Sequence, residues 1–196
     1  MTVAASALEG AFANPAQDAA AAFRCVLDAF ARPGRVGEMR GAEPPEGVSP
    51  AAGAALLTLA DAETALWLPE RLVGSPVAEW LSFHTNAPLT ADRKAAQFAV
   101  GCWEELGLLT GWSQGTPSYP DRSATLIVEV EALEGGPALT LSGPGIPGSC
   151  SFAPTLPPEA GLQLAANHRR FPLGLDLLFS AGTHVAALPR STRIGA

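Results

Sequence analysis

Three Asn-Pro or Ser-Pro pairs, each followed by an apolar stretch, constrain the fold of this chain more than any other sequence feature. A side-chain oxygen directly ahead of a proline suits the N-cap and the first position of an α-helix. The pairs therefore predict helices that begin at Asn14-Pro15, Ser49-Pro50 and Ser75-Pro76. The first helix is expected to end at Arg32-Pro33-Gly34 and the second at Asp61. The apolar residues that share one face of the first helix by spacing are Phe23, Val26, Leu27 and Phe30.

Short apolar runs between and after these helices are typical of buried strands. They cover residues 65–68, 97–100, 175–179 and 185–188. The clearest hairpin pairs residues 125–130 with residues 139–141 through Gly135-Gly136.

The Pro- and Gly-rich residues 143–158 are expected to form a connection, and residues 159–169 a further helix. Helices and short strands intermix along the chain, and no internal repeat is visible. We therefore expect an α/β fold, a single domain over residues 1–196 with a mixed β-sheet flanked by helices.

The charge of the chain limits the classes of partner that we expect. The 196 residues carry 12 basic and 19 acidic side chains, a net charge of -7, without a stripe of Lys and Arg. Because nucleic-acid binding rests on such a stripe, nucleic acid is not an expected partner. Charged residues make up 16% of the chain, against about 25% in an average soluble protein. The apolar surface that this leaves predicts contact with a partner chain.

Cysteine usage and hydropathy indicate the compartment. Cys25, Cys102 and Cys150 are odd in number, far apart and form no CxxC pair, which favours a reducing compartment over a disulfide framework. The N-terminal stretch lacks a basic segment followed by an apolar run, and no stretch reaches about 18 uninterrupted apolar residues. We expect a cytoplasmic protein without a signal peptide or a membrane span.

No group of reactive residues in the sequence indicates a metal or a cofactor. The histidines, His84, His168 and His184, stand alone without an HxH or HExxH spacing. The single lysine, Lys94, lies in a polar run, where a desolvated Schiff-base amine is not expected. Residues 143–148 are rich in glycine but lack the Lys-Ser/Thr of a P-loop. We therefore expect no cofactor, no metal and no catalytic residue.

Two polar motifs are candidates for ligand contact. His84 and Asn86 follow the third predicted helix, and Arg190 and Arg193 flank two hydroxyl residues after the last predicted strand. Arginine and hydroxyl groups at a strand end suit a phosphate or a carboxylate. Helix capping and solvation of the chain end explain the same residues without a ligand.

Seven blocks, spread over nearly the whole chain, resemble blocks of one family in the same order. They are Phe23-Arg24 through Arg32-Pro33-Gly34, residues 56–64, 83–89 and 98–100, Gly143-Pro144-Gly145-Ile146, residues 171–176, and Leu188-Pro189-Arg190-Ser191-Thr192. The family is PhnH, a component of the carbon–phosphorus lyase system, which helps bacteria to use phosphonates. The resemblance makes Arg24, Arg32, His84, Asn86 and Arg190 the candidate ligand-binding residues.

The resemblance implies a fold similar to the large domain of pyridoxal-phosphate-dependent transferases, without the cofactor site. It also implies a homodimer and assembly with subunits G, I and J. Together with subunits G, I and L, the family forms ribose 1-phosphonate 5-triphosphate from ATP and an alkylphosphonate. The later cleavage of the carbon–phosphorus bond belongs to subunit J, and three scattered cysteines could not hold its iron–sulfur cluster. On this basis we expect an accessory subunit of the complex, inactive alone, with a phosphonate or a nucleotide as its ligand.

Other functions stay open from the residues alone. His84 with Asp61 would suit a stand-alone small-molecule hydrolase, and Lys94 would suit a degenerate pyridoxal-phosphate enzyme. Cys102 with His84 would suit nucleophilic catalysis, although a lone cysteine is more often a small buried apolar residue. A homodimeric scaffold would need no ligand at all.

Overall fold

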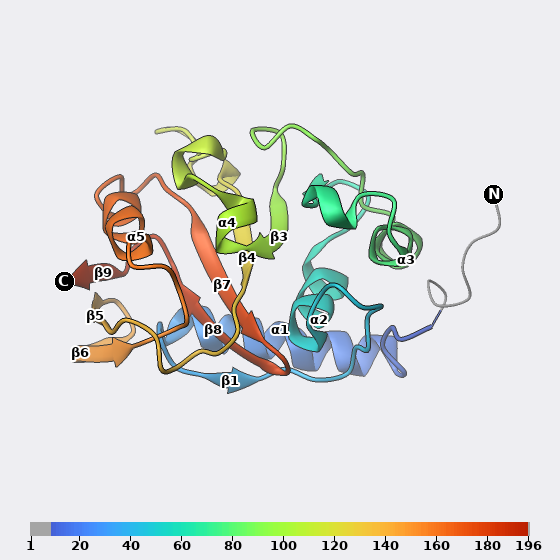
Figure 1. The fold of residues 1–196 in the computed structure, drawn as a ribbon, viewed down its shortest axis with the longest axis horizontal. Coiled ribbons are helices and arrows are strands. Elements are labelled where there is room, and N and C mark those ends of the chain that lie inside the picture. The colour runs from blue at the N-terminus through green and yellow to red at the C-terminus, as the bar shows by residue number, and fades with distance from the viewer. Residues whose placement is uncertain (1–8, 196) are drawn as a thin grey trace.

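The computed structural model of the protein describes residues 9–195, so residues 1–8 and 196 of the expected domain lie outside it. The helices are α1 (Pro15–Ala31), α2 (Pro50–Leu59), α3 (Pro76–Thr85), α4 (Trp103–Leu106) and α5 (Ala160–His168), with 3-10 turns η2 (Glu70–Leu72), η3 (Leu109–Gly111) and η4 (Pro120–Arg122). The strands are β1 (Gly37–Glu38), β2 (Leu66–Trp67), β3 (Phe98–Cys102), β4 (Thr125–Glu129), β5 (Leu139–Gly143), β6 (Ile146–Phe152), β7 (Asp176–Ala181), β8 (His184–Leu188) and β9 (Arg193–Gly195). Figure 1 shows their arrangement.

Six strands form the main sheet in the order β1-β8-β7-β4-β3-β2. β2, β3, β4 and β7 run parallel, whereas β8 lies antiparallel to β7 and to β1. The register aligns Cys102 with Glu129, and Glu129 with Ser180, so the carboxyl ends of β3, β4 and β7 meet at one edge. This sheet and the helices beside it confirm the predicted mixed α/β fold.

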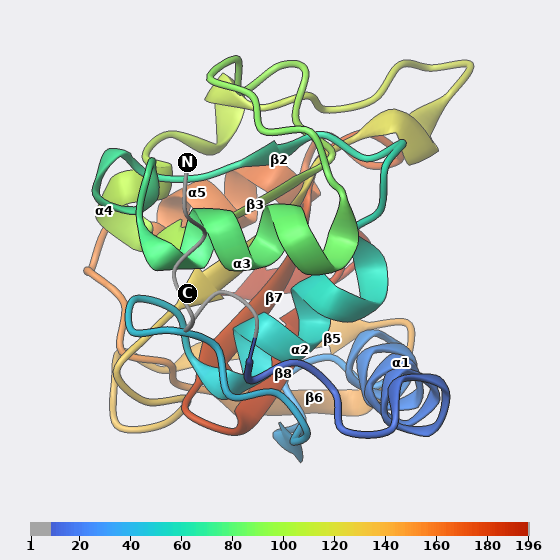
Figure 2. The same cartoon turned by 90° about the vertical axis from the view of Figure 1, so that its right-hand side faces the viewer.

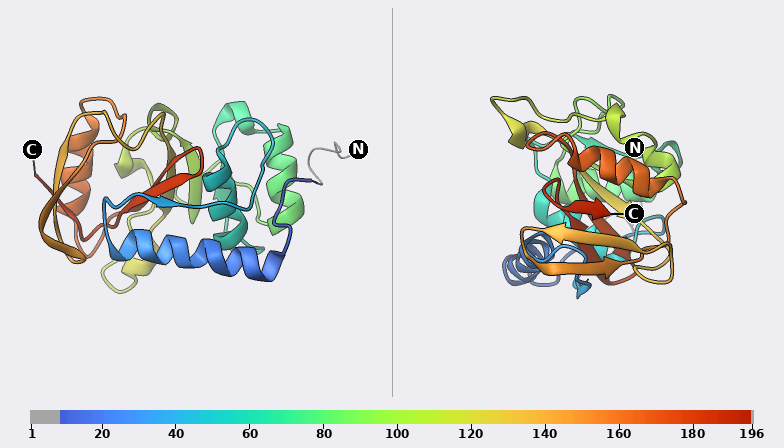
Figure 3. Two further views of the ribbon diagram at one scale, coloured as in Figure 1. Left: turned by 90° about the horizontal axis from the view of Figure 1, so that it is seen from below. Right: turned by 90° about the vertical axis from the view of Figure 1, so that its left-hand side faces the viewer.

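Each face of the main sheet has its own core, because alternate strand residues point to opposite faces. Ile127 and Leu178 pack with residues of α1, α2 and α3, which lie in front of the sheet in Figure 2. Leu126 and Leu177 pack with residues of α4, α5 and a second sheet, of order β6-β5-β9 (Figure 3). Each large apolar side chain buried in these cores contributes about 1.5–3 kcal/mol.

The predicted helix starts are confirmed, and two of the three have the predicted cap. The hydroxyls of Ser49 and Ser75 accept hydrogen bonds from backbone N–H groups three residues on, at 3.2 and 3.5 Å. The Asn14 side chain makes no such bond; its backbone N–H donates to the carboxylate of Asp18 at 2.8 Å instead. α2 ends at Leu59, two residues before the predicted end.

The predicted buried face of α1 is partly wrong. Ala22 and Val26 are buried, but Phe23 is 45% and Leu27 is 52% exposed. Consecutive helix residues are about 100° apart, so Phe23 and Leu27 stand beside the buried face rather than on it. Val26 is buried and Phe30 packs against the core as predicted, whereas Phe23 and Leu27 stay outside it.

The hairpin predicted for residues 125–130 and 139–141 is wrong. β4 lies between β3 and β7 in the main sheet, and β5 pairs with β6 and β9 in the second sheet. Residues 143–158, expected as a connection, therefore contain β6. The remaining predicted strands correspond to β2, β3, β7 and β8, and the last predicted helix to α5.

Candidate functional site

Arg190, which follows β8, is held by several segments of the protein. Its Nε and Nη2 donate to the two carboxylate oxygens of Asp176, at 3.1 and 2.5 Å. Nη1 donates to the Pro120 carbonyl at 2.5 Å, and Nη2 also donates to the Ser123 hydroxyl. Nδ1 of His168 in α5 lies 3.2 Å from the Arg190 carbonyl oxygen. The donors of this guanidinium therefore point to the protein itself.

His84 and Asn86 lie at the end of α3. Asn86 is the C-cap residue, with a left-handed φ of 56°, and its N–H donates to the Ser82 carbonyl at 3.1 Å. The His84 ring lies edge-on to the rings of Trp80 and Phe83, at centroid distances of 5.5 and 4.9 Å. A helix cap and an aromatic cluster explain this motif locally.

The structure does not bring His84 and Asn86 together with Arg190. α3 packs on the sheet face that carries α1 and α2, whereas Arg190 contacts α5 on the opposite face. Figure 1 shows α3 and α5 near opposite ends of the molecule. The two motifs are therefore separate features.

Arg24 in α1 and Arg32, the C-cap residue that follows α1, are both exposed. Asp28 stands one helical turn from each, pairs with Arg32, and lies 3.8 Å from Nη1 of Arg35. Arg32 and Arg35 also line a groove of about 230 Å³ beside Ile146 of β6. Of the five candidate residues, Arg24 and Arg32 are therefore the two that share a surface.

Three of the sequence blocks meet where the β5–β6 hairpin reaches the end of α1. Gly145 at the hairpin tip has φ +81°, and a Cβ there would lie 2.1 Å from the Ala31 carbonyl oxygen. Gly143 has φ +127°, and a Cβ there would lie 3.2 Å from the Ser191 carbonyl oxygen. Glycine at both positions therefore lets the hairpin contact α1 on one side and the C-terminal segment on the other.

The sequence analysis missed a polar row at the carboxyl ends of β3, β4 and β7. Cys102, Glu129 and Ser180 are in register there, on the face that α2 covers. Ser49, the N-cap of α2, donates its N–H to Oε1 of Glu129 at 2.7 Å, and its Oγ lies 2.5 Å from Oγ of Ser180. Burial raises the pKa of Glu129. The available signal was a glutamate at the end of an apolar strand, and the wrong hairpin assignment left it without a partner from another strand.

An ion pair between Arg71 and Glu105 lies at the same edge of the sheet, beside the carboxyl end of β3. Nε and Nη2 of Arg71 donate to the two Glu105 carboxylate oxygens at 2.6 and 3.2 Å, and the Cys102 N–H donates to Oε2 at 2.9 Å. Burial alone would raise the pKa of Glu105, but these hydrogen bonds outweigh it, and the pKa lies below its usual value. Ligands of open α/β sheets usually bind at this edge, yet here its side chains bind one another.

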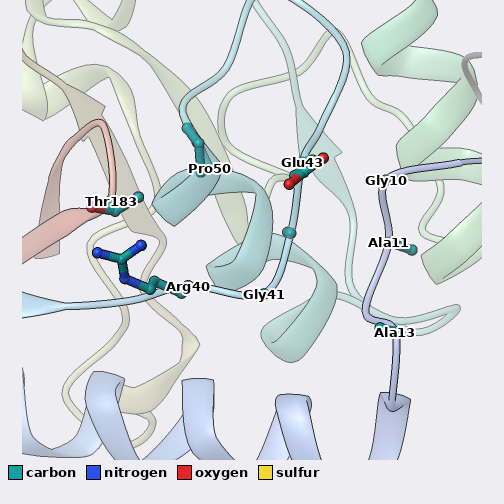
Figure 4. Close-up of a pocket in the computed structure, with 9 residues that line it drawn as sticks. Gly10, Ala11, Ala13, Arg40, Gly41, Glu43, Pro50 and Thr183 are labelled. Carbon is teal, nitrogen blue, oxygen red and sulfur yellow. The ribbon is translucent and has the colours of Figure 1, made fainter.

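A surface hollow of about 480 Å³ lies beside Pro50 at the start of α2 and Thr183 in the β7–β8 turn (Figure 4). Arg40 and Glu43 are its charged lining residues, and glycines and alanines supply most of the rest. Arg40 pairs with Glu38 and is itself exposed. The sequence analysis named none of these residues as a candidate for ligand contact.

Lys94, the candidate Schiff-base residue, has hydrogen-bond partners within the protein. Nζ of Lys94 donates to the carbonyls of Thr110 and Trp112, at 2.9 and 2.7 Å. Within residues 9–195, no group of three or more His, Cys, Asp or Glu side chains could hold a metal ion. No helix in that part of the chain has the length and apolar character needed to cross a membrane.

The fold and these contacts define a class: a mixed α/β protein whose motif arginines and carboxylates largely bind one another and nearby backbone groups. Residues 10–195 match the family described as "Bacterial phosphonate metabolism protein (PhnH)". The chain therefore belongs to the PhnH family.

Two relatives support this assignment. The chain is 43% identical to the "Alpha-D-ribose 1-methylphosphonate 5-triphosphate synthase subunit PhnH" of Rhizobium meliloti (strain 1021), over 99% of this chain and 98% of that protein. It is 32% identical to the "Putative C-P lyase subunit protein HtxG" of Stutzerimonas stutzeri, over 88% of this chain and 84% of that protein. The resemblance seen in the sequence blocks is thus confirmed.

Proposed function

We propose that this chain is an accessory subunit of an α-D-ribose 1-methylphosphonate 5-triphosphate synthase that acts in the cytoplasm and has no turnover alone. The observation that carries the proposal is the 43% identity to subunit PhnH of that synthase, over 99% of this chain and 98% of the relative. Similarity that extends over almost the whole of both chains favours a shared role over a shared fragment.

The expected partners are subunits G, I and J of the complex, together with a second copy of this chain. The exposed apolar residues support a surface that is covered by other chains. Val73 and Leu108 are 65% and 66% exposed, and charged residues make up only 16% of the chain.

For the candidate ligand-binding residues, the contacts favour two different roles. Arg190, His84 and Asn86 are proposed to stabilise the fold, because their described contacts lie within the protein. Arg24 and Arg32 stay candidates for contact with an anionic group, because both are exposed, in α1 and at its C-cap. ATP and the alkylphosphonate would then bind where this chain meets other subunits.

We further propose that the fold is a relative of the large domain of pyridoxal-phosphate-dependent transferases. The four parallel neighbours in its mixed sheet are compatible with that relationship. The residues do not fit the cofactor, because the single lysine, Lys94, donates to two backbone carbonyls. A pyridoxal-phosphate enzyme needs a lysine that is available to form a Schiff base.

The hydrolase alternative receives no support from its carboxylate. Oδ1 of Asp61 accepts from the Glu63 N–H at 2.9 Å and from the Thr64 hydroxyl at 3.1 Å. These bonds form the turn that follows α2, whereas His84 lies in the last turn of α3. The carboxylate therefore has a turn-forming role of its own.

Deletion of the gene in its host tests the proposed function. We expect the deletion strain to stop growing with methylphosphonate as the sole phosphorus source and to grow normally on phosphate. A plasmid copy of the chain should restore growth. Normal growth of the deletion strain on methylphosphonate would overturn the proposal.

A further inference from the structure

The outward side of α1 carries an apolar surface that the core does not use. A helix on a globular core needs one apolar face, and Ala22, Val26 and Ala29 supply it. Phe23 and Leu27 are neighbours on a second side, at spacing i, i+4, and are 45% and 52% exposed. α1 therefore has a second apolar face that is open to contact.

Basic side chains flank this second face. Arg24, Arg32 and Arg35 are all exposed. Asp28 pairs with Arg32, lies 3.8 Å from Nη1 of Arg35 and stands one helical turn from Arg24. Three arginines and one aspartate give a local charge of +2, on a chain whose net charge is -7. The end of α1 is therefore a positive region on an acidic protein.

The same surface continues past the end of α1. The β5–β6 hairpin lies beside that end (Figure 3), and Ile146 and Pro147 line the groove of about 230 Å³ that Arg32 and Arg35 also line. Apolar side chains bordered by cations thus extend from the outward side of α1 into a groove.

We propose that this outward side of α1, with the groove at its end, docks an acidic surface of another subunit of the synthase. This docking rests on the proposed function, and it identifies the surface by which this chain would join the synthase. Apolar side chains of the partner would cover Phe23 and Leu27, and its carboxylates would pair with Arg24 and Arg32. Opposite charge at the rim orients the partner and speeds its association.

Charge complementarity favours an acidic partner over a second copy of this chain. In a two-fold dimer the same patch meets itself, so the arginines of one copy would face those of the other. Juxtaposed like charges oppose association. The length is sufficient, because the 17 residues of α1 span about 25 Å, a dimension compatible with an interface of about 800 Å² per partner.

Co-purification with the other synthase subunits, expressed together from the same organism, tests the proposal. The variants are Leu27→Glu and the double change Arg24→Glu/Arg32→Glu. The matched controls are Leu162→Glu in α5 and Arg169→Glu at the C-cap of α5, two exposed positions on the opposite side of the sheet. Thermal melting of each purified variant shows whether it is folded.

We expect both α1 variants to weaken assembly at least tenfold, with both controls unchanged. Binding of the wild-type chain should weaken as salt is raised, and binding of the arginine variant should depend less on salt. If the folded α1 variants assemble as well as the wild type, the docking surface is wrong and the proposed function stands. If the wild-type chain itself fails to assemble, the proposed function fails, and the inference with it. Loss of self-association in Leu27→Glu, with assembly intact, would assign the surface to a second copy and overturn the inference.

Discussion

The guanidinium of Arg190 binds both carboxylate oxygens of Asp176, and the Arg190 backbone N–H donates to Oδ1 of the same carboxylate at 2.8 Å. The two side chains are only 13% and 25% exposed. The contact joins the end of β8 to the start of β7, next to β4 in the main sheet. An arginine that the sequence presents as an anion-binding candidate is thus a link within the fold.

Arg190→Ala should lower the free energy of unfolding by about 2–4 kcal/mol, because the partly buried Asp176 carboxylate loses its partner. Urea denaturation measures this. Arg193→Ala, at an exposed position of β9, is the control and should cost less than about 0.5 kcal/mol. Unchanged stability of Arg190→Ala together with lost growth on methylphosphonate would assign the arginine to a ligand instead.

Gly145→Ala should destabilise the protein by at least about 2 kcal/mol, since strain at φ +81° is combined with a Cβ 2.1 Å from the Ala31 carbonyl oxygen. Gly148→Ala is the matched control. Gly148 has φ +73° with nothing within 4 Å of an added Cβ, so only backbone strain of about 1 kcal/mol is expected. Equal losses of stability in the two variants would show that the hairpin does not press on α1.

Glu129→Gln should change how stability depends on pH. Burial raises the pKa of Glu129 above its ordinary value of 4.5, so between the two values the folded chain keeps a proton that the unfolded chain has released. This contribution to stability is fully present below pH 4.5 and is lost as the pH rises through the raised pKa. The amide oxygen of the variant still accepts from Ser49.

We therefore expect Glu129→Gln to gain stability relative to the wild type as the pH is raised from 4 to 8, when both are followed by urea denaturation. Glu131→Gln, at an exposed position nearby, should show no such trend. A difference between Glu129→Gln and the wild type that stays constant with pH would contradict the account of Glu129.

Arg93→Ala should cost about 2 kcal/mol of stability, because Arg93 lies 4.8 and 5.0 Å from the ring centroids of Trp67 and Trp112 and donates to the Leu106 carbonyl at 2.7 Å. Tryptophan fluorescence during urea unfolding reports the loss. Arg122→Ala removes a cation from an exposed tyrosine ring and should cost less than about 1 kcal/mol. Similar losses of stability in the two variants would show that the contacts of Arg93 with Trp67 and Trp112 add no more stability than an exposed cation–π contact.

The helices could be predicted from the sequence because their signals are local. The hydroxyls of Ser49 and Ser75 accept hydrogen bonds from backbone N–H groups only three residues further along the chain, so a short stretch of sequence contains the whole signal. The sequence predicted the strands β2, β3, β4, β5, β7 and β8 but not β1, β6 and β9. One predicted pairing was wrong, because an apolar run does not indicate which strand it pairs with. β4 pairs with β3 and β7 through long crossovers, whereas the adjacent β5 joins another sheet.

The site could be predicted less well than the helices, because its contacts join distant residues. Glu129 and Ser49 are 80 positions apart, and Arg190 and Ser123 are 67 apart. Nothing in the block around Arg190 indicates that its donors are already occupied. The family resemblance covered nearly the whole chain and was confirmed, yet it did not separate residues that stabilise the fold from residues that contact a partner.

The most direct test of the central claim is a turnover assay with ATP and methylphosphonate, followed by phosphorus NMR. The purified chain alone should form no ribose 1-methylphosphonate 5-triphosphate. The other synthase subunits should form it only when this chain is added. Formation of the product by the isolated chain would contradict the account, because it would require a catalytic centre that these residues do not supply.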